Sequence, residues 1–430
     1  MASPAAAEPG LAREPRADGD ALHGSGPAPV GLYVHVPFGV SLCPYCDFPV
    51  VTGRATRGPT SRIPRFLAAL HAEIELRADV LDATVGPVRP PLDTVYLGGG
   101  TPSLLGPPAV SALLEHIARR FGIAVGAEVT LEANPGPAER GDIAGARAAG
   151  VTRLSLGAQS LQPAELRALG RRHQPGDVAA AIAEARAASI ASVSLDLLSD
   201  VPDQTLASWR ATLDAAMTLA PDHLSAYALT LEDPDADGLT GPGGDHLPVR
   251  PGARRWRERA RRAQDQDRAA DMDALTDAVL APAGLSRYEL SNHARPGHAS
   301  RHNLGYWRRR PIAAVGPGAH AFDGVAVRSW NAARLDGWLG ALLPANGDPP
   351  TLPPGGRTTL TPEDARSETA ILGLRLAEGI AASAEADPLL ASGLAWARDH
   401  GLLEAVPPDR LRLTPRGRLL SNEVFARLLP

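Results

Sequence analysis

The chain has 430 residues, 44% hydrophobic and 21% charged, with a net charge of −5, and no apolar run approaches the length of a membrane span. Its two cysteines are too few for a disulfide framework, so we expect a cytoplasmic protein. All 43 basic side chains are arginines, which excludes a P-loop or Schiff-base lysine, and the negative net charge argues against nucleic-acid binding.

Residues 1–28 are rich in Ala, Pro and Gly and have no apolar h-region, so we expect a disordered tail rather than a secretory signal. From residue 29 to 232, short β-type runs alternate with amphipathic helical patterns. The expected strands are residues 32–36, 94–97, 128–132, 152–156, 192–198 and 224–231. One helical face carries Val110, Leu113, Leu114, Ile117 and Phe121. About six successive βα units predict an α/β fold, an incomplete (β/α)6 barrel.

The next part of the chain is predicted to hold an insertion and an extension of the barrel. Residues 233–252 are rich in Pro, Gly and Asp and indicate a surface insertion. Over residues 253–340 we expect a helix at 271–280 and a strand at 287–290. The arginine run at 250–262 is interpreted as a solvated helix face.

The end of the chain is predicted to be a separate small domain. Residues 341–362 have the composition of a linker. From 363 to 430, an apolar strand, a turn, the strand "LRLT" and a closing helix predict a winged-helix-like α+β unit. Because no dense basic stripe accompanies it, we interpret this unit as a packing module rather than a DNA reader.

Unusual residues follow the expected strands of the barrel. In strand order they are Cys43 and Cys46, "GGGTPS" (98–103), Glu132, Gln159, Asp196 and Tyr227. The carboxyl ends of parallel strands share one edge, where barrel active sites form, so we expect these residues to gather there.

The tetrapeptide C-P-Y-C (43–46) allows several interpretations. A C-x-x-C at a helix start suits disulfide exchange, and this tetrapeptide resembles the glutaredoxin active site, but glutaredoxins are small single domains. A zinc half-site lacks a second pair of ligands at the usual spacing. Two inert buried cysteines fit poorly with a polar, Pro-rich loop.

The segment "YVHVPFGVSLCPYCDF" (33–48) resembles the cluster loop of radical SAM proteins, in particular the oxygen-independent coproporphyrinogen III oxidase family and its haem-chaperone branch, HemW. The resemblance continues through "YLGGGTPS" (96–103), "LEANPG" (131–136), "LSLGAQS" (154–160), "YELSNHA" (288–294), "HNLGYW" (302–307) and "GLRLAEGI" (373–380). The oxidase branch has a further cysteine where this chain has Phe48, so "CPYCDF" and "HNLGYW" together favour the chaperone branch.

The resemblance implies three cofactors: S-adenosylmethionine, a [4Fe–4S] cluster on Cys43 and Cys46, and haem. The implied S-adenosylmethionine contacts are Tyr33, Tyr45, Gly99, Gly100, Thr101, Glu132, Gln159, Arg171 and Asp196. His302 is a candidate axial ligand of haem, and the alternative is a satisfied histidine at a packed helix start. The implied partners are haem-acceptor proteins and, if the cluster forms, an electron donor, whereas the sequence does not support peripheral membrane association.

The first cysteine of the family's C-x3-C-x2-C spacing is replaced by Gly39. Two thiolates hold a cubane cluster poorly, and a ligand from Ser41, His35 or Asp47 departs from the family spacing. A second departure places Ser199 and Asp200 where the family usually has Tyr-Gly. Three explanations stay open: a lost cluster with a retained binding role, a ligand recruited from outside, or a sequence error at residue 39.

The leading functional hypothesis is a HemW-like protein that binds haem and passes it to acceptor proteins. The enzymatic alternative is a coproporphyrinogen III oxidase of porphyrin biosynthesis, against which Gly39 and Phe48 both speak. The third hypothesis is a cluster-free pseudoenzyme that acts as a binding scaffold.

Overall fold

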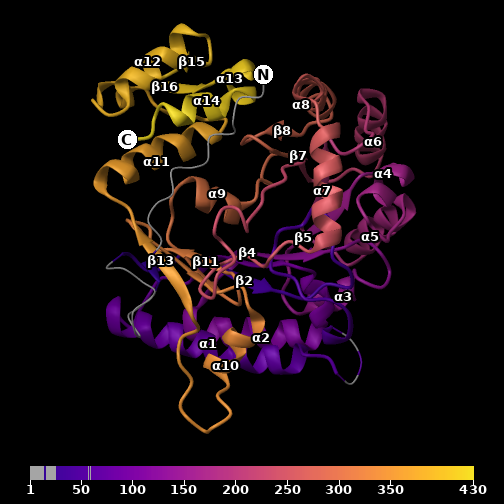
Figure 1. The fold of residues 1–430 in the computed structure, drawn as a ribbon, viewed down its shortest axis with the longest axis vertical. Helices are drawn as coiled ribbons and strands as arrows, with labels where there is room; N and C mark the ends of the chain where they lie inside the picture. The colour runs from indigo at the N-terminus through magenta and orange to yellow at the C-terminus, as the bar shows by residue number, and fades with distance from the viewer. Residues whose placement is uncertain (1–13, 16–25, 57, 59) are drawn as a thin grey trace.

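The computed structural model describes residues 14–15 and 26–430, apart from 57 and 59. The predicted disordered tail therefore lies outside the described residues, except for 26–28 and for strand β1 (Glu14–Pro15), which pairs with strand β13 (Gly355–Thr359). A curved sheet with helices along its outer face forms the larger part of the molecule, and a small C-terminal unit lies beyond the opposite face (Figure 1).

Neighbouring parallel strands form the centre of the sheet, as the alternating sequence pattern predicts. They are β2 (Gly31–Val36), β3 (Leu92–Gly99), β4 (Ile123–Ala133), β5 (Arg153–Gln159), β6 (Ser192–Ser199) and β7 (His223–Ala228). The last strand is shorter than the predicted 224–231 because its neighbour ends at Ser199, opposite Ala228, and no ladder partner follows.

The sheet has 13 strands and continues past the parallel centre on both sides. Beside β2 lie β10 (Ile312–Val315), β11 (His320–Phe322), β12 (Val327–Asn331), β13 and β1, and beside β7 lie β9 (Asn292–Ala294) and β8 (Ser286–Arg287). The strand predicted at 287–290 is short because the chain reverses there: the Tyr288 amide donates to Asn292 O. The barrel is therefore open, with strands of the extension built into the same sheet.

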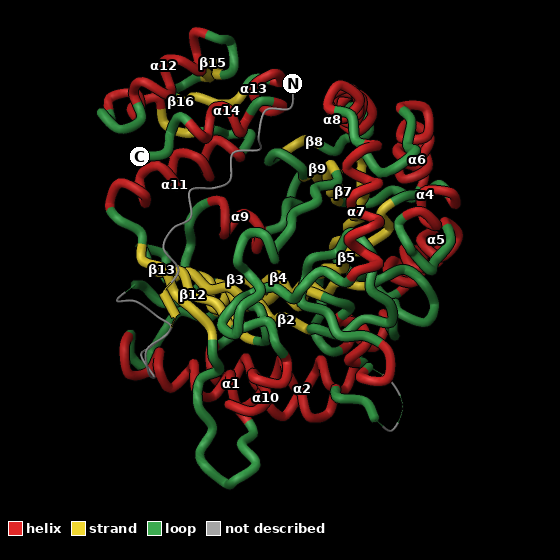
Figure 2. Tube along the Cα trace, viewed as in Figure 1, coloured by secondary structure: helices red, strands yellow, loops and turns green. Residues whose placement is uncertain are grey.

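Helices connect the strands and cover the outer face of the sheet (Figure 2). They are α1 (Ile63–Thr84), α2 (Pro107–Phe121), α3 (Ile143–Ala148), α4 (Pro163–Ala168), α5 (Pro175–Ala187), α6 (Leu206–Thr218), α8 (Gln266–Leu280) and α10 (Leu335–Leu342). Helix α8 starts before the predicted residue 271 because Asp265 caps it, accepting from the amides of Asp267 and Arg268.

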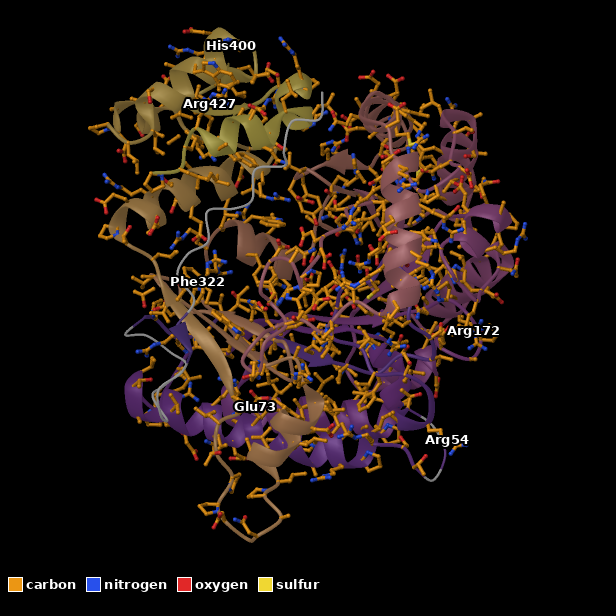
Figure 3. The ribbon with its side chains drawn as sticks, viewed as in Figure 1. Arg54, Glu73, Arg172, Phe322, His400 and Arg427 are labelled. Carbon is orange, nitrogen blue, oxygen red and sulfur yellow. The ribbon has the colours of Figure 1, made fainter. Side chains whose placement is uncertain are left out.

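Glu73 ties helix α1 to the strands that extend the sheet (Figure 3). This fully buried carboxylate accepts hydrogen bonds from Arg77, from Asn331 at the end of β12 and from the Trp338 indole of α10. A buried charge is tolerated only when it is paired and hydrogen-bonded, and this set meets both conditions.

Successive residues of the parallel strands face opposite sides of the sheet. Apolar residues such as Leu32, Val95 and Leu195 are fully buried in the main core under the outer helices. The alternate residues, among them Tyr33 and Tyr96, face the concave side, where polar side chains prevail. A parallel sheet covered by helices on one side thus leaves a polar concave wall for chemistry.

Helix α9 (Arg301–Trp307) lies on the concave side, between the sheet and the C-terminal unit (Figure 1). That unit comprises α11 (Pro362–Arg375), β14 (Ile380–Ala381), α12 (Ala391–Asp399), β15 (Leu403–Val406), β16 (Arg410–Leu413), α13 (Pro415–Leu419) and α14 (Ser421–Ala426). Its antiparallel sheet and helices enclose a hydrophobic core of their own, as the sequence pattern predicts.

Candidate functional site

The pairing of the parallel strands brings the predicted site residues to one edge of the sheet. Gly98 lies opposite His35, Asp196 lies opposite Gly157, and Glu132 is the penultimate residue of β4. Gln159 ends β5 with a left-handed backbone, φ +65°, at a register shift against β6. The loop with the two cysteines begins where β2 ends, at the same edge.

Glu132 is a buried carboxylate at the centre of this edge. It accepts hydrogen bonds from the Tyr96 hydroxyl at 2.7 Å and from the Gly99 amide at 3.0 Å. Burial raises the pKa of Glu132 to about 7, and the nearby charge of Asp196 adds to the rise. At neutral pH a cationic ligand group would therefore draw the carboxylate into its ionised form.

The glycines of the "GGGTPS" loop are required by close packing. A Cβ on Gly98 would lie 2.8 Å from the Tyr96 ring and 3.1 Å from Glu132 Oε1. On Gly99, which has a φ of +110°, it would lie 2.5 Å from the His35 ring, and on Gly100 it would meet Phe38 O at the same distance. The loop backbone thus lies directly against the polar wall.

Asp196 lies beside Glu132 on the same wall. Its carboxylate accepts from the hydroxyls of Ser155 at 2.9 Å and Ser225 at 2.8 Å, both on neighbouring strands. Burial raises the pKa of Asp196, and these hydrogen bonds oppose the rise. The two carboxylates together form an acceptor pair that suits amino and hydroxyl groups of a ligand.

Arg171 connects this wall to the cysteine loop. It donates to Asn134 Oδ1 and Gly157 O, and its Nη1 lies 3.6 Å from Cys43 Sγ. Its Nε is buried without a partner among the described residues. An orphaned guanidinium donor at this position fits a site that a bound group completes.

Both cysteines are free thiols, Cys43 buried and Cys46 half-buried. Burial raises the pKa of Cys46 to about 12, and Cys43 and Asp47 add to the rise. The thiolate is the nucleophile of a cysteine, so Cys46 in this environment is not activated near neutral pH.

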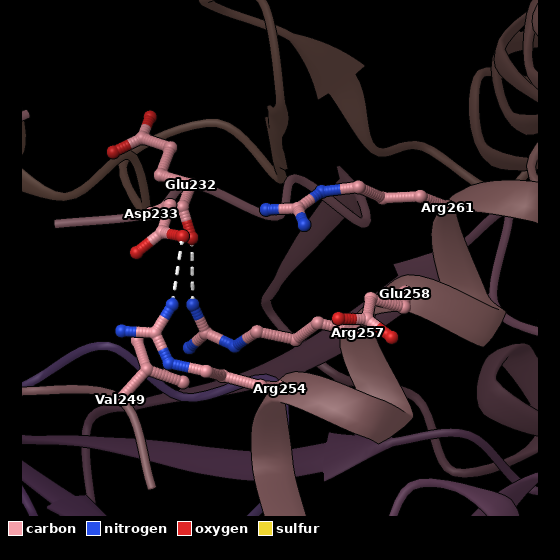
Figure 4. A pocket seen from close by; sticks show the side chains of 7 residues that line it. All are labelled: Glu232, Asp233, Val249, Arg254, Arg257, Glu258 and Arg261. Carbon is pink, nitrogen blue, oxygen red and sulfur yellow. Dashed lines mark hydrogen bonds and ion pairs between the residues drawn. The ribbon is translucent and has the colours of Figure 1, made fainter. Parts of the chain in front are cut away.

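Helix α7 (Pro251–Ala263) holds the cysteine loop through one arginine, whereas Arg255, Arg259, Arg261 and Arg262 of the same run are exposed, as the interpretation of a solvated face expects. Arg257 is buried and donates to the carbonyl oxygens of Pro44, Tyr45 and Cys46 at 3.0–3.1 Å. It also donates to Glu232 O, and Arg254 beside it pairs with Asp233 (Figure 4). The burial of Arg257 alone differs from that expectation, because three carbonyls turned inward need donors and one guanidinium supplies them.

The residues of the loop do not fit a cluster bound by three thiolates. Gly39 offers no side chain, and the described residues contain no group of three or more His, Cys, Asp or Glu placed to hold a metal ion. His35 is no substitute in this conformation, because its Nε2 donates to Pro49 O and its Nδ1 accepts from the Tyr33 hydroxyl. Burial also lowers the pKa of His35 to about 4, so it is neutral.

His302 lies away from this edge, near the amino ends of the strands. It is 2% exposed, and its ring nitrogens are hydrogen-bonded to Thr94 Oγ1 at 2.8 Å and to the Tyr306 hydroxyl at 3.0 Å. Burial lowers its pKa to about 3. A haem iron would have to displace one of these partners, so the conformation matches the packed, satisfied histidine of the alternative interpretation.

Sequence reasoning missed several residues of the site. Tyr96 and Ser155 stand two positions before Gly98 and Gly157, so strand alternation alone signals that they share the wall. Arg257 gave no such signal, because it reaches the cysteine loop from a helix more than 200 positions later in the chain.

The comparisons with known proteins agree with this geometry. A model of the radical SAM superfamily matches residues 33–216, and one of the HemN C-terminal domain matches residues 360–420. The chain is 41% identical to "Heme chaperone HemW" of Mycobacterium tuberculosis, over 93% of this chain and 95% of that protein. The chain belongs to the HemW family of radical SAM proteins.

Other members of the HemW family and a solved structure extend the comparison. The Escherichia coli heme chaperone HemW is 36% identical over 68% of this chain and 70% of its own. The coproporphyrinogen III oxidase HemN of Escherichia coli superposes with a TM-score of 0.75 over 94% of this chain and 90% of that one, at 22% identity. This last similarity shows the shared fold. No helix among the described residues of this HemW-family chain is long and apolar enough to cross a membrane.

Proposed function

We propose that this chain binds haem and passes it to haem-acceptor proteins, and that it does so without a resident [4Fe–4S] cluster. The binding and transfer of haem are supported by the 41% identity with a heme chaperone over nearly the whole of both chains. The second half is supported by Gly39, which leaves Cys43 and Cys46 as the only thiols of the chain.

The polar groups of the site support a further part of the proposal, that the chain binds S-adenosylmethionine. Glu132 would accept from the amino group, Asp196 from the ribose hydroxyls, and Arg171 would use its unpaired Nε. The remaining proposed contacts, which would line the same edge, are Tyr33, Tyr45, Gly99, Gly100, Thr101 and Gln159. When bound, S-adenosylmethionine would supply a sulfonium group, while the residues of this chain orient it and exclude water.

We propose that the chain acts in the cytoplasm, in keeping with its two free thiols. His302 is proposed as a structural residue, since both its ring nitrogens are occupied. An acceptor protein with an empty haem site is the partner that this function requires, and an electron donor is required only where a cluster forms.

Titration of the full chain with haem, followed by absorbance, tests the proposed function. We expect saturable binding of about one haem per chain, and transfer to an apo-acceptor when the loaded protein is mixed with it. Weak binding that never saturates would overturn the proposal. An anaerobic assay that converts coproporphyrinogen III to protoporphyrinogen would instead establish the oxidase activity.

A further inference from the structure

A histidine that binds haem iron needs a ring nitrogen that is unprotonated and accessible. Of the described histidines, two are exposed, His320 and His400. The Nε2 atom of His320 lies 3.0 Å from Asp245 Oδ2, and its Nδ1 is next to Cβ, where the chain itself crowds a macrocycle. His400 is therefore the described histidine best placed to bind iron.

A backbone carbonyl fixes which nitrogen of His400 carries the proton. His400 Nδ1 lies 2.8 Å from Trp396 O, and because a carbonyl oxygen can only accept, Nδ1 is the donor. In the neutral ring Nε2 then holds the lone pair, and no described residue forms a hydrogen bond with it. Metal-binding histidines use the same arrangement: one ring N–H donates to a carbonyl or carboxylate, and the other nitrogen binds the metal.

The imidazole ring of His400 is also held by stacking. It lies on the indole of Trp396, with the ring centroids 4.5 Å apart and an angle of 29° between the planes. Figure 3 places His400 at the end of the C-terminal unit that points away from the sheet. A ring held by a hydrogen bond and a stacking contact is preorganised for a ligand, because little side-chain freedom remains to be lost on binding.

Arg416 of α13 supplies a cation beside His400. It is exposed, and its Nη1 donates to His400 O at 3.2 Å, which leaves its other donors without an acidic partner among the described residues. Arg427, which lies over the Trp396 ring, is paired with Glu423 at 2.9 Å and is therefore already neutralised. A guanidinium binds a carboxylate through two parallel hydrogen bonds, so Arg416 suits a propionate of haem.

Exposed leucines follow Arg416 in the chain. Leu419 is 48% exposed and Leu420 is 40% exposed. The Leu420 amide donates to Arg416 O at 3.1 Å, so the helical turn continues to this residue. Side chains three and four positions apart lie on the same face of a helical turn, which places both leucines on the side of Arg416. This surface thus offers an iron ligand, a cation and apolar side chains, the groups that a porphyrin with propionates requires.

We propose that His400 is the axial ligand of haem through Nε2, with Arg416 binding a propionate and Leu419 and Leu420 lying against the macrocycle. This inference rests on the proposed haem-binding function and names the residues that would perform it. A site on the surface suits a protein that passes haem on, because an acceptor protein can reach the bound haem while the carrier stays folded.

Titration of the full chain with haem and with iron-free protoporphyrin IX, followed by absorbance, tests the axial ligand. We expect the native chain to bind haem about tenfold or more tightly than the iron-free porphyrin, because only haem offers an iron to Nε2. His400→Gln should lose this preference, and because the residue is exposed its circular dichroism spectrum should stay native. His320→Gln is the matched control, since that histidine is also exposed and also stacks on a tryptophan, Trp330, and it should bind like the native chain.

Haem dimethyl ester tests the contact with the propionate. The native chain should bind haem about threefold more tightly than the ester, a modest effect because the ion pair is exposed, and Arg416→Gln should lose that difference. An unchanged difference in Arg416→Gln would overturn this contact.

Two further outcomes separate the ligand from the function. Haem binding that stays saturable in His400→Gln, with native affinity and a native spectrum, would overturn the site and leave the proposed function standing. A native chain that fails to saturate with haem would overturn both.

Discussion

The cysteine loop and the polar wall beside it share one edge of the sheet, yet they differ in completeness. The wall retains paired carboxylates, a glycine loop without room for side chains and an arginine with a spare donor. The loop is held by Arg257 but has no side chain at Gly39, where the family spacing places its first cysteine.

The comparison indicates that the conformation of the loop and its ability to bind a metal rest on different groups: backbone carbonyls for the first, thiols for the second. Backbone carbonyls of residues 44–46 bind a guanidinium, and this contact requires no thiolate. These hydrogen bonds hold the backbone of the loop without using its thiols. Five predictions test the loop, the wall and His302.

The largest expected effect is on metal loading. After anaerobic reconstitution, Gly39→Cys should hold about four irons and four sulfides per chain, and the native chain substantially fewer. Gly39 does not have a left-handed backbone, and a Cβ there would lie 3.0 Å from Val50 Cγ1, so the cysteine requires Val50 to shift by a few tenths of an ångström. Gly39→Ser is the control for bulk. Full loading of the native chain would show that another ligand completes the site.

Removal of Arg257 should release the loop and leave the wall intact. Arg257→Ala leaves inward-facing carbonyls without a donor, which should lower the free energy of unfolding by about 4 kcal/mol and speed alkylation of Cys46. Urea denaturation and thiol-labelling rates measure the two effects. Arg255→Ala, an exposed change on the same helix, should change neither. Equal labelling rates in the two variants would contradict the holding role of Arg257.

His302 should matter for stability rather than for haem. His302→Ala removes a buried ring with two partners and should cost about 3 kcal/mol in urea denaturation, while the haem affinity of the folded protein changes by less than about twofold. Tyr306→Phe, which removes one of those hydrogen bonds, should cost about 1 kcal/mol. Loss of haem binding in a folded His302→Ala protein would restore the axial-ligand hypothesis.

The contribution of the polar wall to the free energy of unfolding should depend on pH, whereas that of the cysteine loop should not. Burial raises the pKa of Glu132 from 4.5 to about 7, so the folded state binds its proton more tightly than the unfolded state. The contribution of Glu132 to stability therefore falls as the pH rises between those values and is constant above them. Glu132→Gln should remove this slope, worth about 3 kcal/mol across the window, as measured by urea denaturation at several pH values.

The ionisation of Glu132 should have the opposite effect on cofactor binding, which should become tighter as the pH rises. Since a ligand amino group pairs with ionised Glu132, calorimetry should show S-adenosylhomocysteine binding more tightly as the pH rises through about 7. In Glu132→Gln this dependence should disappear. An affinity that is independent of pH in the native chain would show that the amino group binds elsewhere.

Much of the fold could be predicted because its signals are local. Alternation along each strand, as in Val193, Leu195 and Leu197, follows from the two faces of a sheet, and the glycine loop after β3 follows from the position of the strand end. The shared edge of Glu132 and Asp196 could be predicted for the same reason, since parallel strands align their carboxyl ends. The strand boundaries at Ala228 and Arg287 could not, because they depend on where a neighbouring strand stops.

By itself, the sequence determined the family, the parallel sheet, the separate C-terminal core and the missing ligand at Gly39. Each of these follows from residue types and their spacing within one segment of the chain. Only the tertiary structure decided that Arg257 holds the cysteine loop and that both ring nitrogens of His302 are occupied. These properties depend on groups brought together from distant parts of the chain, and the distances between them are set by packing.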